Sequence, residues 1–262
     1  MAVPVSRPGR APVIGVSLKM YFDPERSAAW AKRVAAIAAG HPDVRDGGLR
    51  LFVLPSLPAL PVVLEELRGT GIEVGAQDLF WEDRGPYTGG VSGADLAAVG
   101  CTLAEIGHAE RRRHFGETDA TINRKVAAAV RNGLTPVLCV GERVRGSAAD
   151  ASAECLAQLE SALADLPPLT GNASLIVAYE PEWAIGVQEA AAPAHVDAVT
   201  ADLREVLDRA AWPGGTSVIY GGSAGPGLLP QLGSAVDGLF LGRFAHDPDA
   251  LGAILDDALA RR

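Results

Sequence analysis

The sequence predicts a single-domain α/β protein in which eight parallel strands close into a barrel surrounded by helices. The first observation is an alternation of apolar runs of strand length with longer, helix-compatible segments, repeated eight times. The second is size, since 262 residues with 48% hydrophobic content match the roughly 250 residues that a barrel of eight strand-helix units needs. The fold class expected is therefore a (β/α)8 barrel.

The expected strands are continuous apolar runs, as is usual where both faces of a parallel sheet are buried. In chain order they are 13–18, 49–54, 72–75, 103–106, 136–140, 175–179, 217–220 and 238–241. Alanine-rich windows between them carry apolar residues at three- and four-residue steps, which predicts helices with one face against the sheet. These windows are 27–39, 121–131, 149–163, 194–210 and 248–259.

We expect one barrel domain at residues 13–262 after a short tail at 1–12, because no linker or shift in composition divides the chain.

The net charge is -9 and no basic run stands out, which argues against nucleic-acid or membrane partners. We expect neither a signal peptide nor a membrane span, for want of a long enough apolar run. The three cysteines lack paired metal-ligand spacing, which predicts reduced, buried thiols and a cytoplasmic protein.

A histidine, His108, stands directly after an apolar strand and at the start of a helix, in the segment GHAERR at 107–112. The partial positive charge of a helix N-terminus lowers the basicity of an imidazole. A neutral imidazole there can polarise a substrate carbonyl. The ordinary alternative is a hydrogen-bonded core histidine.

A glutamate, Glu180, ends the run at 175–179 and is followed by a loop that begins Pro181-Glu182-Trp183. A carboxylate at the C-terminal end of a barrel strand, under such a loop, is typical of a base beneath a lid. A glutamate that only caps or forms a salt bridge is the commoner alternative, but the loop sequence favours the base. Glu182 is interpreted as a solvated charge.

These two segments and four others resemble triosephosphate isomerase and occur in the order in which that family has them. The six are SLK at 17–19, GHAERRRHFGET at 107–118, LCVGE at 138–142, AYEPEWAIG at 178–186, YGGS at 220–223 and LG at 241–242. The resemblance covers nearly the whole chain. It implies a TIM barrel and an isomerase that moves a proton through an enediol on a small phosphorylated sugar, with no metal or organic cofactor.

The resemblance also implies the catalytic roles. Glu180 is the general base, His108 handles the substrate oxygens, and Lys19 supplies positive charge in the pocket; this family is itself the standard example of such acid-base tuning. Glu110 supports the site and pairs with Lys19. The alternatives are a rim lysine that reaches to water and an ordinary glutamate in the first turn of a helix.

Phosphate binding is expected from backbone amides, because glycines allow the chain to approach the oxygens closely. The residues assigned to the phosphate are Gly186, Gly222, Ser223 and Gly242. Pro181 and Trp183 belong to the lid. Tyr220 resembles the residue that latches the closed lid by a hydrogen bond, with a core aromatic as the alternative. Lid closure would exclude water and limit loss of phosphate from the enediol.

Thr88, within GPYTGG at 85–90, resembles the tip of a loop that reaches into a neighbouring subunit, which implies a homodimer. The alternative is a plain surface turn. Cys139 and Glu142 match positions that serve packing and charge networks. The remaining histidines, expected at the surface or in structural roles, are His41, His114, His195 and His246.

The sequence departs from the family at positions that cluster around the ligand. The departures are Ser17 for Asn, Leu18 for Trp, Ala109 for Ser, Arg243 for the second phosphate glycine, Gly90 for Glu in the dimer loop, and VQEA at 187–190 for the lid's Gly-Lys-Thr run. The shorter Ser17 leaves room for an additional carbon at the reacting end. Arg243 is expected to bind phosphate through two parallel hydrogen bonds.

Ser17 and Arg243 resemble the erythrulose-phosphate isomerase branch, which converts L-erythrulose 1-phosphate to D-erythrulose 4-phosphate. That substrate is dihydroxyacetone phosphate with one hydroxymethyl group added. Leu18 and the lid match neither branch, so a triosephosphate isomerase whose pocket has drifted stays open. A non-catalytic phosphosugar-binding barrel also stays open, although it would need no proton-transfer pair.

Overall fold

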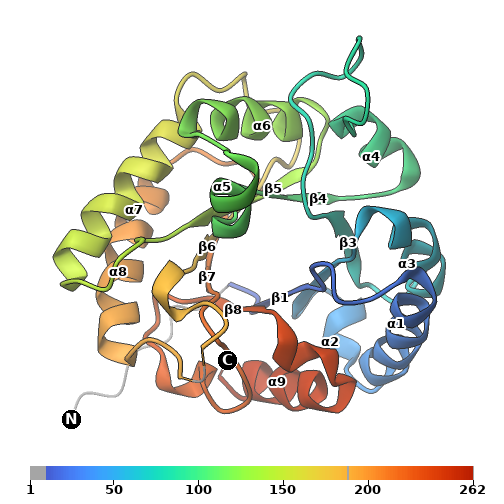
Figure 1. Cartoon of the computed structure of the whole chain (residues 1–262). Coiled ribbons are helices and arrows are strands. Elements are labelled where there is room, and N and C mark those ends of the chain that lie inside the picture. The colour runs from blue at the N-terminus through green and yellow to red at the C-terminus, as the bar shows by residue number, and fades with distance from the viewer. Residues whose placement is uncertain (1–9, 188, 262) are drawn as a thin grey trace.

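Eight parallel strands form a closed barrel in which each strand pairs with the next and β8 pairs with β1 (Figure 1). The computed structural model describes residues 10–187 and 189–261. The strands are β1 (Val13–Ser17), β2 (Arg50–Leu54), β3 (Glu73–Ala76), β4 (Leu103–Ile106), β5 (Thr135–Val140), β6 (Leu175–Tyr179), β7 (Thr216–Tyr220) and β8 (Gly238–Leu241). The predicted (β/α)8 barrel is confirmed.

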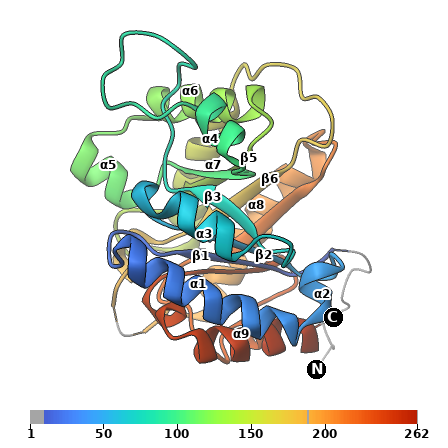
Figure 2. The same ribbon diagram turned by 90° about the vertical axis from the view of Figure 1, so that its right-hand side faces the viewer.

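Helices cover the outside of the barrel (Figures 1 and 2). The α-helices are α1 (Pro24–Ala39), α2 (Pro42–Arg45), α3 (Leu60–Glu66), α4 (Gly93–Val99), α5 (Ala109–Phe115), α6 (Asp119–Arg131), α7 (Ala148–Leu163), α8 (Pro193–Arg209) and α9 (Pro248–Ala260). The described residues also contain the short 3₁₀-helices η1 (Leu57–Ala59), η2 (Glu182–Ala184), η3 (Leu229–Gln231) and η4 (Arg243–His246). Within the described ranges, no helix has the length and apolarity needed to cross a membrane.

Helix α1 begins three residues earlier than the periodic pattern predicted. Asp23 caps it, since its carboxylate accepts a hydrogen bond from the backbone N–H of Arg26 at 2.7 Å. Pro24 occupies the first turn, where its missing N–H costs nothing.

The connection between β7 and β8 corrects a sequence expectation, because it holds the short η3 in place of a longer helix. The intervening segment 221–237 contains five glycines and two prolines, and both residue types disfavour helix interiors. Most of the tail expected at 1–12 lies outside the described residues. Residues 10–12 precede β1 with no helix or strand.

The barrel interior is packed and apolar over most of its depth. Its buried cluster comprises Val13, Phe52, Leu54, Leu103, Val137, Cys139, Ile176, Ala178, Ile219 and Phe240. The ring of Phe52 occupies the space that Gly15 leaves, since a Cβ at Gly15 would lie 2.1 Å from that ring. Strand side chains alternate in direction, so Ser17, Glu105 and Glu180 follow the interior side chains of their own strands. The C-terminal end of the barrel interior is therefore polar.

Candidate active site

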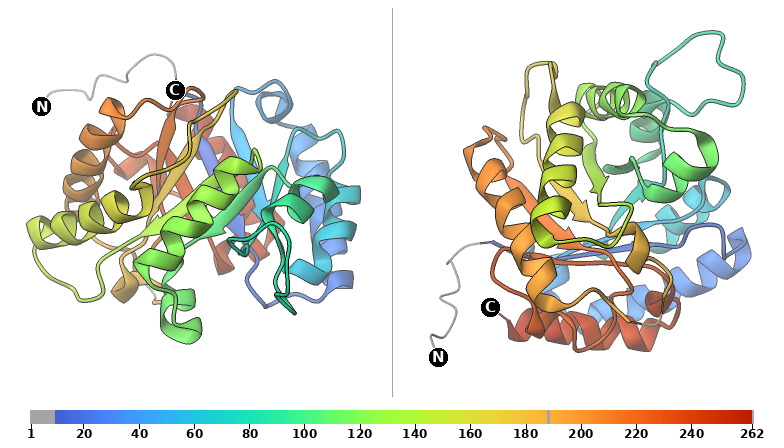
Figure 3. Two further views of the ribbon diagram at one scale, coloured as in Figure 1. Left: turned by 90° about the horizontal axis from the view of Figure 1, so that it is seen from above. Right: turned by 60° about the vertical axis from the view of Figure 1, so that its left-hand side comes forward.

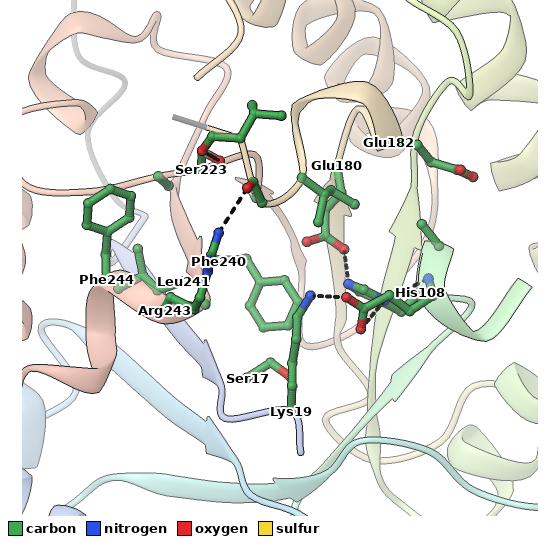
Figure 4. A pocket seen from close by; sticks show the side chains of 18 of the residues that line it. Ser17, Lys19, His108, Glu180, Glu182, Ser223, Phe240, Leu241, Arg243 and Phe244 are labelled. Atoms are coloured by element: carbon green, nitrogen blue, oxygen red, sulfur yellow. Dashed lines mark hydrogen bonds and ion pairs between the residues drawn. The ribbon is translucent and has the colours of Figure 1, made fainter. Parts of the chain in front are cut away.

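The C-terminal ends of the strands surround a cavity of about 470 Å³ (Figure 4). It is lined by Lys19 after β1, His108 after β4, Glu180 after β6 and Gly242 after β8. Residues more than 160 positions apart in sequence thus face one space. The carboxyl groups of Glu180 and Glu110 also line the cavity, so an anionic substrate must be held by hydrogen-bond donors and cations within it.

Glu180 is buried, and the absence of a side chain at Gly221 leaves room for its carboxylate. Its backbone N–H donates to the carbonyl of Val140 at 2.8 Å, which extends the ladder beyond β6. A Cβ at Gly221 would lie 2.7 Å from Glu180 Oε1, so the neighbouring strand must carry glycine there. Burial raises the pKa of Glu180 to about 7, against the opposing effect of Lys19 and a hydrogen bond from Cys139. Such a carboxylate can accept a carbon-bound proton near neutral pH.

His108 is held as a neutral imidazole with a defined tautomer. It caps α5, where its Nδ1 accepts a hydrogen bond from the backbone N–H of Glu110 at 3.1 Å. A backbone N–H can only donate, so the imidazole proton sits on Nε2. Nε2 lies 3.5 Å from Oε2 of Glu180. Burial, followed by the charge of Lys19, lowers the pKa of His108 to about 4.

Lys19 has a left-handed backbone, with φ of 48°. A lysine in this region costs about 1 to 3 kcal/mol and persists where its surroundings enforce it. The amide of Gln77 contributes, since it donates to the carbonyls of Lys19 and Leu54 at 3.0 and 2.9 Å. The ammonium of Lys19 pairs with Glu110 at 2.7 Å. Burial disfavours its charge, but Glu110 and the other nearby carboxylates raise the pKa of Lys19 overall.

The loop at 181–191, which the sequence predicts to be a lid, is tied to the barrel by side-chain hydrogen bonds. The hydroxyl of Ser223 donates to the carbonyls of Ala184 and Val187 at 3.0 and 2.7 Å. The guanidinium of Arg243 donates to the carbonyl of Gly186 at 2.9 Å (Figure 4). Gln188, part of the altered lid run, lies outside the described residues.

Tyr220 and Trp183 hold the two ends of the same loop. The phenol of Tyr220 accepts from the backbone N–H of Ala191 at 2.9 Å and donates to the carbonyl of Gly222 at 2.8 Å. The indole of Trp183 donates to the buried carboxylate of Glu142 at 2.8 Å. The hydroxyl of Tyr179 donates to Oε2 of the same carboxylate at 3.1 Å, and Nε2 of His195 lies 3.1 Å from its Oε1. Glu142 thus anchors the lid.

A sequence profile of the triosephosphate isomerase family matches residues 12–258. The chain belongs to the triosephosphate isomerase family. It is 53% identical over 247 residues to the L-erythrulose-1-phosphate isomerase of Pectobacterium atrosepticum, which covers 94% of this chain and 95% of that protein. It is 38% identical over 253 residues to the triosephosphate isomerase of Moorella thermoacetica, covering 94% and 98%. The crystal structure of triosephosphate isomerase from Bartonella henselae superposes with a TM-score of 0.78, at 27% identity, over 97% of this chain and 100% of that one.

The cavity of this triosephosphate isomerase family member brings together most of the residues that the sequence assigned to it. They are Ser17, Lys19, His108, Glu110, Glu180, Gly186, Ser223, Gly242 and Arg243. Glu182, interpreted as a solvated charge, is half-buried and lines the same cavity. Thr88 lies elsewhere, on the exposed loop between β3 and α4 that projects from the barrel (Figures 2 and 3).

Sequence reasoning missed three residues of this region. Gln77, which holds the backbone of Lys19, lies in none of the family motifs quoted above. Phe240 lines the cavity, although its run reads only as an apolar strand. Glu105 lies buried beside Ser17, and the signal that could have found it is a carboxylate inside a fully buried strand.

We expect kcat/KM to rise about tenfold per pH unit below pH 7 and to level off above it. Glu180 must be ionised to take a proton, and its pKa is raised to about 7. His108, whose pKa is lowered to about 4, stays neutral throughout. The measurement is kcat/KM from pH 5 to 9. The pKa of the substrate phosphate is determined separately, and the profile is corrected for the fraction of substrate in the dianionic form. A corrected profile that is flat from pH 5 to 8 would be incompatible with Glu180 as the base.

Proposed function

We propose that this protein interconverts L-erythrulose 1-phosphate and D-erythrulose 4-phosphate. Membership of the family makes it an isomerase of sugar phosphates. The observation that carries the narrower proposal is its 53% identity, over nearly the full length, to a protein named for that reaction. The serine at position 17 of the cavity wall supports it, since a side chain shorter than the family's asparagine admits one more carbon.

The proposed chemistry is a proton transfer between adjacent carbons. In L-erythrulose 1-phosphate the carbonyl is at C2, and the carboxylate of Glu180 removes the proton from C3. The electron pair of that C–H bond forms the C2–C3 double bond of an enediolate. Glu180 then returns a proton to C2 and the carbonyl re-forms at C3. Nothing enters or leaves, so the atoms and electrons balance within the substrate.

His108 and Lys19 are proposed to manage the charge of the oxygens during that transfer. The Nε2–H of His108 donates its proton to the C2 oxygen as negative charge develops there, and the imidazole recovers a proton from the C3 hydroxyl. The ammonium of Lys19 stabilises the same charge. Both side chains are largely buried, and in such surroundings a fixed charge has a larger effect than in bulk solvent.

The phosphate is proposed to lie between the lid and β8, against the backbone amides of Gly186, Ser223 and Gly242. A Cβ at Gly242 would meet no atom within 4 Å, so open space adjoins that backbone on the cavity wall. Ser223 has its own left-handed backbone, with φ of 49°, which presents its amide beside the lid. Closure of the lid over the phosphate excludes water from the enediolate.

We expect Arg243→Gly, which restores the usual family residue, to raise KM about tenfold or more and to change kcat less, as for loss of a charge-assisted hydrogen bond. Arg243 contacts the lid at Gly186 and borders the proposed phosphate position. Steady-state kinetics on the phosphorylated substrate provide the measurement, with Arg33→Ala on exposed α1 as the matched loss of a guanidinium. An unchanged KM would limit Arg243 to lid contacts.

We further propose that two copies of the chain form a homodimer. Thr88 stands exposed on the projecting β3–α4 loop, and Met20, next to Lys19, is 92% exposed. Its neighbour Tyr21 is 54% exposed, and covering these two side chains at a subunit interface would remove apolar surface from water, which is favourable. Light scattering at micromolar concentration should give the mass of two chains, and Thr88→Arg should shift it toward one. A monomeric mass for the wild-type protein would contradict the proposal.

A cytoplasmic location is proposed on the state of the cysteines. Cys101, Cys139 and Cys155 are all buried, free thiols. Disulfides are frequent in oxidising compartments and rare in the cytosol, so reduced thiols fit the latter. Recovery of the protein in a secreted fraction of its own cells would contradict this.

The reaction itself can be followed by nuclear magnetic resonance in deuterated water. A proton held on Glu180 exchanges with solvent, so D-erythrulose 4-phosphate formed from L-erythrulose 1-phosphate should carry deuterium at its phosphate-side carbinol carbon. Binding without formation of this product would favour the non-catalytic barrel. Conversion without any deuterium would contradict exchange of the Glu180-bound proton with solvent, and the rate of Glu180→Gln would then separate a shielded proton transfer from a hydride shift.

A further inference from the structure

A carboxyl group lies inside the barrel where apolar packing is the rule. Glu105 belongs to β4, two residues beyond the interior side chain Leu103, and is 3% exposed. Removing a carboxylate from water is costly unless it is paired or protonated. Glu105 has no part in the proton transfer described above, so its position calls for another role.

The hydrogen-bond partner of Glu105 is the hydroxyl of Ser17, whose Oγ lies 3.1 Å from Glu105 Oε2. Within the described chain no lysine, arginine or histidine nitrogen lies within 4.0 Å of this carboxyl. The ammonium of Lys19 pairs with Glu110 instead. Burial, together with the charge of Glu180, raises the pKa of Glu105 to about 8. Glu105 is therefore a neutral acid at neutral pH.

Ser17 connects this buried acid to the cavity. It ends β1, lines the cavity and is separated from β4 by two intervening strands, β2 and β3. In Figure 4 it lies near Lys19 and Phe240 and away from Ser223. The β1–β8 pairing, in which Val16 is opposite Leu241, brings the backbone of Ser17 close to Gly242, but its hydroxyl points to Glu105 on β4, across the barrel from β8. The hydroxyl of Ser17 is thus directed away from the strand that carries Gly242, toward the side of the cavity where the non-phosphorylated end of a substrate would lie.

We propose that Glu105 is a positioning residue for substrate choice: it orients the hydroxyl of Ser17 so that this hydroxyl binds the terminal hydroxymethyl group of a four-carbon sugar phosphate. This inference rests on the proposed function. The proton of Ser17 is directed to Glu105, which leaves the lone pairs of Ser17 Oγ to accept from the terminal O–H of the substrate.

The contact discriminates because a three-carbon substrate has no group to make it. A site built to bind a hydroxyl rejects an analogue that lacks it, since the polar atom is then unpaired or holds a water molecule. Without Glu105, the Ser17 hydroxyl would rotate among several acceptors. The four-carbon substrate would then lose the contact, whereas the triose has none to lose.

The test compares kcat/KM on L-erythrulose 1-phosphate and on D-glyceraldehyde 3-phosphate for three single variants. Glu105→Leu removes the carboxyl at similar volume, and we expect it to lower the four-carbon to three-carbon ratio at least about tenfold. Glu105→Gln keeps a neutral acceptor for Ser17, so its ratio should stay within about threefold of wild type. Leu103→Met perturbs the same strand and should affect both substrates equally.

Equal losses on both substrates in Glu105→Leu, or a ratio like that of wild type, would overturn the inference and leave the proposed function standing. A wild-type protein inactive on the four-carbon substrate would overturn both. Should Glu105→Leu fail to fold, Ser17→Ala removes the same contact from the cavity side. It should lower the ratio to a similar extent, and an unaltered ratio there would also reject the inference.

Discussion

Glu180→Gln is expected to lower kcat by about 10³- to 10⁴-fold with little change in KM, the upper part of the range for removal of a general base. Glutamine has the shape of the glutamate and fits the space beside Gly221, where a Cβ would already approach Oε1 to 2.7 Å. Its amide cannot accept the carbon-bound proton. The phosphate contacts stay, so binding of substrate or of a phosphate analogue should persist.

Glu182→Gln is the matched control, because this carboxylate lies two residues further along and lines the same cavity. It should keep kcat within about threefold of wild type, since Glu182 makes no contact with His108 or Lys19 among those described. The measurement is kcat by a coupled assay on protein purified free of host isomerase. A Glu180→Gln variant with a near wild-type rate would rule out Glu180 as the base.

Lys19→Met is expected to lower kcat/KM at least about 100-fold, as does removal of a preorganised group that stabilises developing charge. The ammonium stands beside the carboxylates of Glu110 and Glu180, which raise its pKa and keep it charged. Without it the cavity repels both the phosphate and the enediolate. Methionine keeps the length of the side chain and inherits the same left-handed backbone, so the effect reports on charge.

Lys32→Met, on the exposed face of α1, provides the comparison for Lys19→Met. It should leave kcat/KM within about threefold of wild type, as for an ordinary surface substitution. Partial recovery of the Lys19→Met variant by added alkylammonium ions would confirm that the missing charge is responsible. A loss of less than about tenfold would place Lys19 at the rim, in the role of a solvated side chain.

The barrel and its main site could be predicted because both depend on local patterns. Each strand is a short apolar run, because the strands of a parallel sheet that is buried on both faces consist mainly of apolar residues. His108 and Glu180 stand at strand ends, the one place in such a barrel where polar groups gather. The order of short motifs around them then indicated the family, which the comparisons confirmed.

Glu105 and Gln77 escaped prediction because their roles depend on the other side of the barrel. Glu105 lies within an apolar run and acquires its partner, Ser17, from a strand 88 residues earlier. Gln77 supports the backbone of Lys19, 58 residues away. Such contacts follow from barrel closure, which no local pattern encodes.

The prediction of a longer helix after β7 was wrong for a local reason. The glycines and prolines of 221–237 were present in the sequence, but the regular alternation of the other units masked them. Arg243 differs again, since the sequence assigned it to phosphate and the structure shows a contact with the lid carbonyl of Gly186. Its grip on phosphate stays a prediction for the Arg243→Gly variant.

The most direct measurement is kcat/KM of the purified protein on L-erythrulose 1-phosphate and D-glyceraldehyde 3-phosphate, side by side, with Glu180→Gln as the control for host isomerase. We expect Glu180-dependent turnover of both and a preference for the four-carbon substrate of about 100-fold or more. A preference for the triose would contradict the proposed substrate and make Ser17 and Arg243 tolerated changes in a triosephosphate isomerase. Absence of Glu180-dependent turnover on either substrate would contradict the enzyme assignment itself.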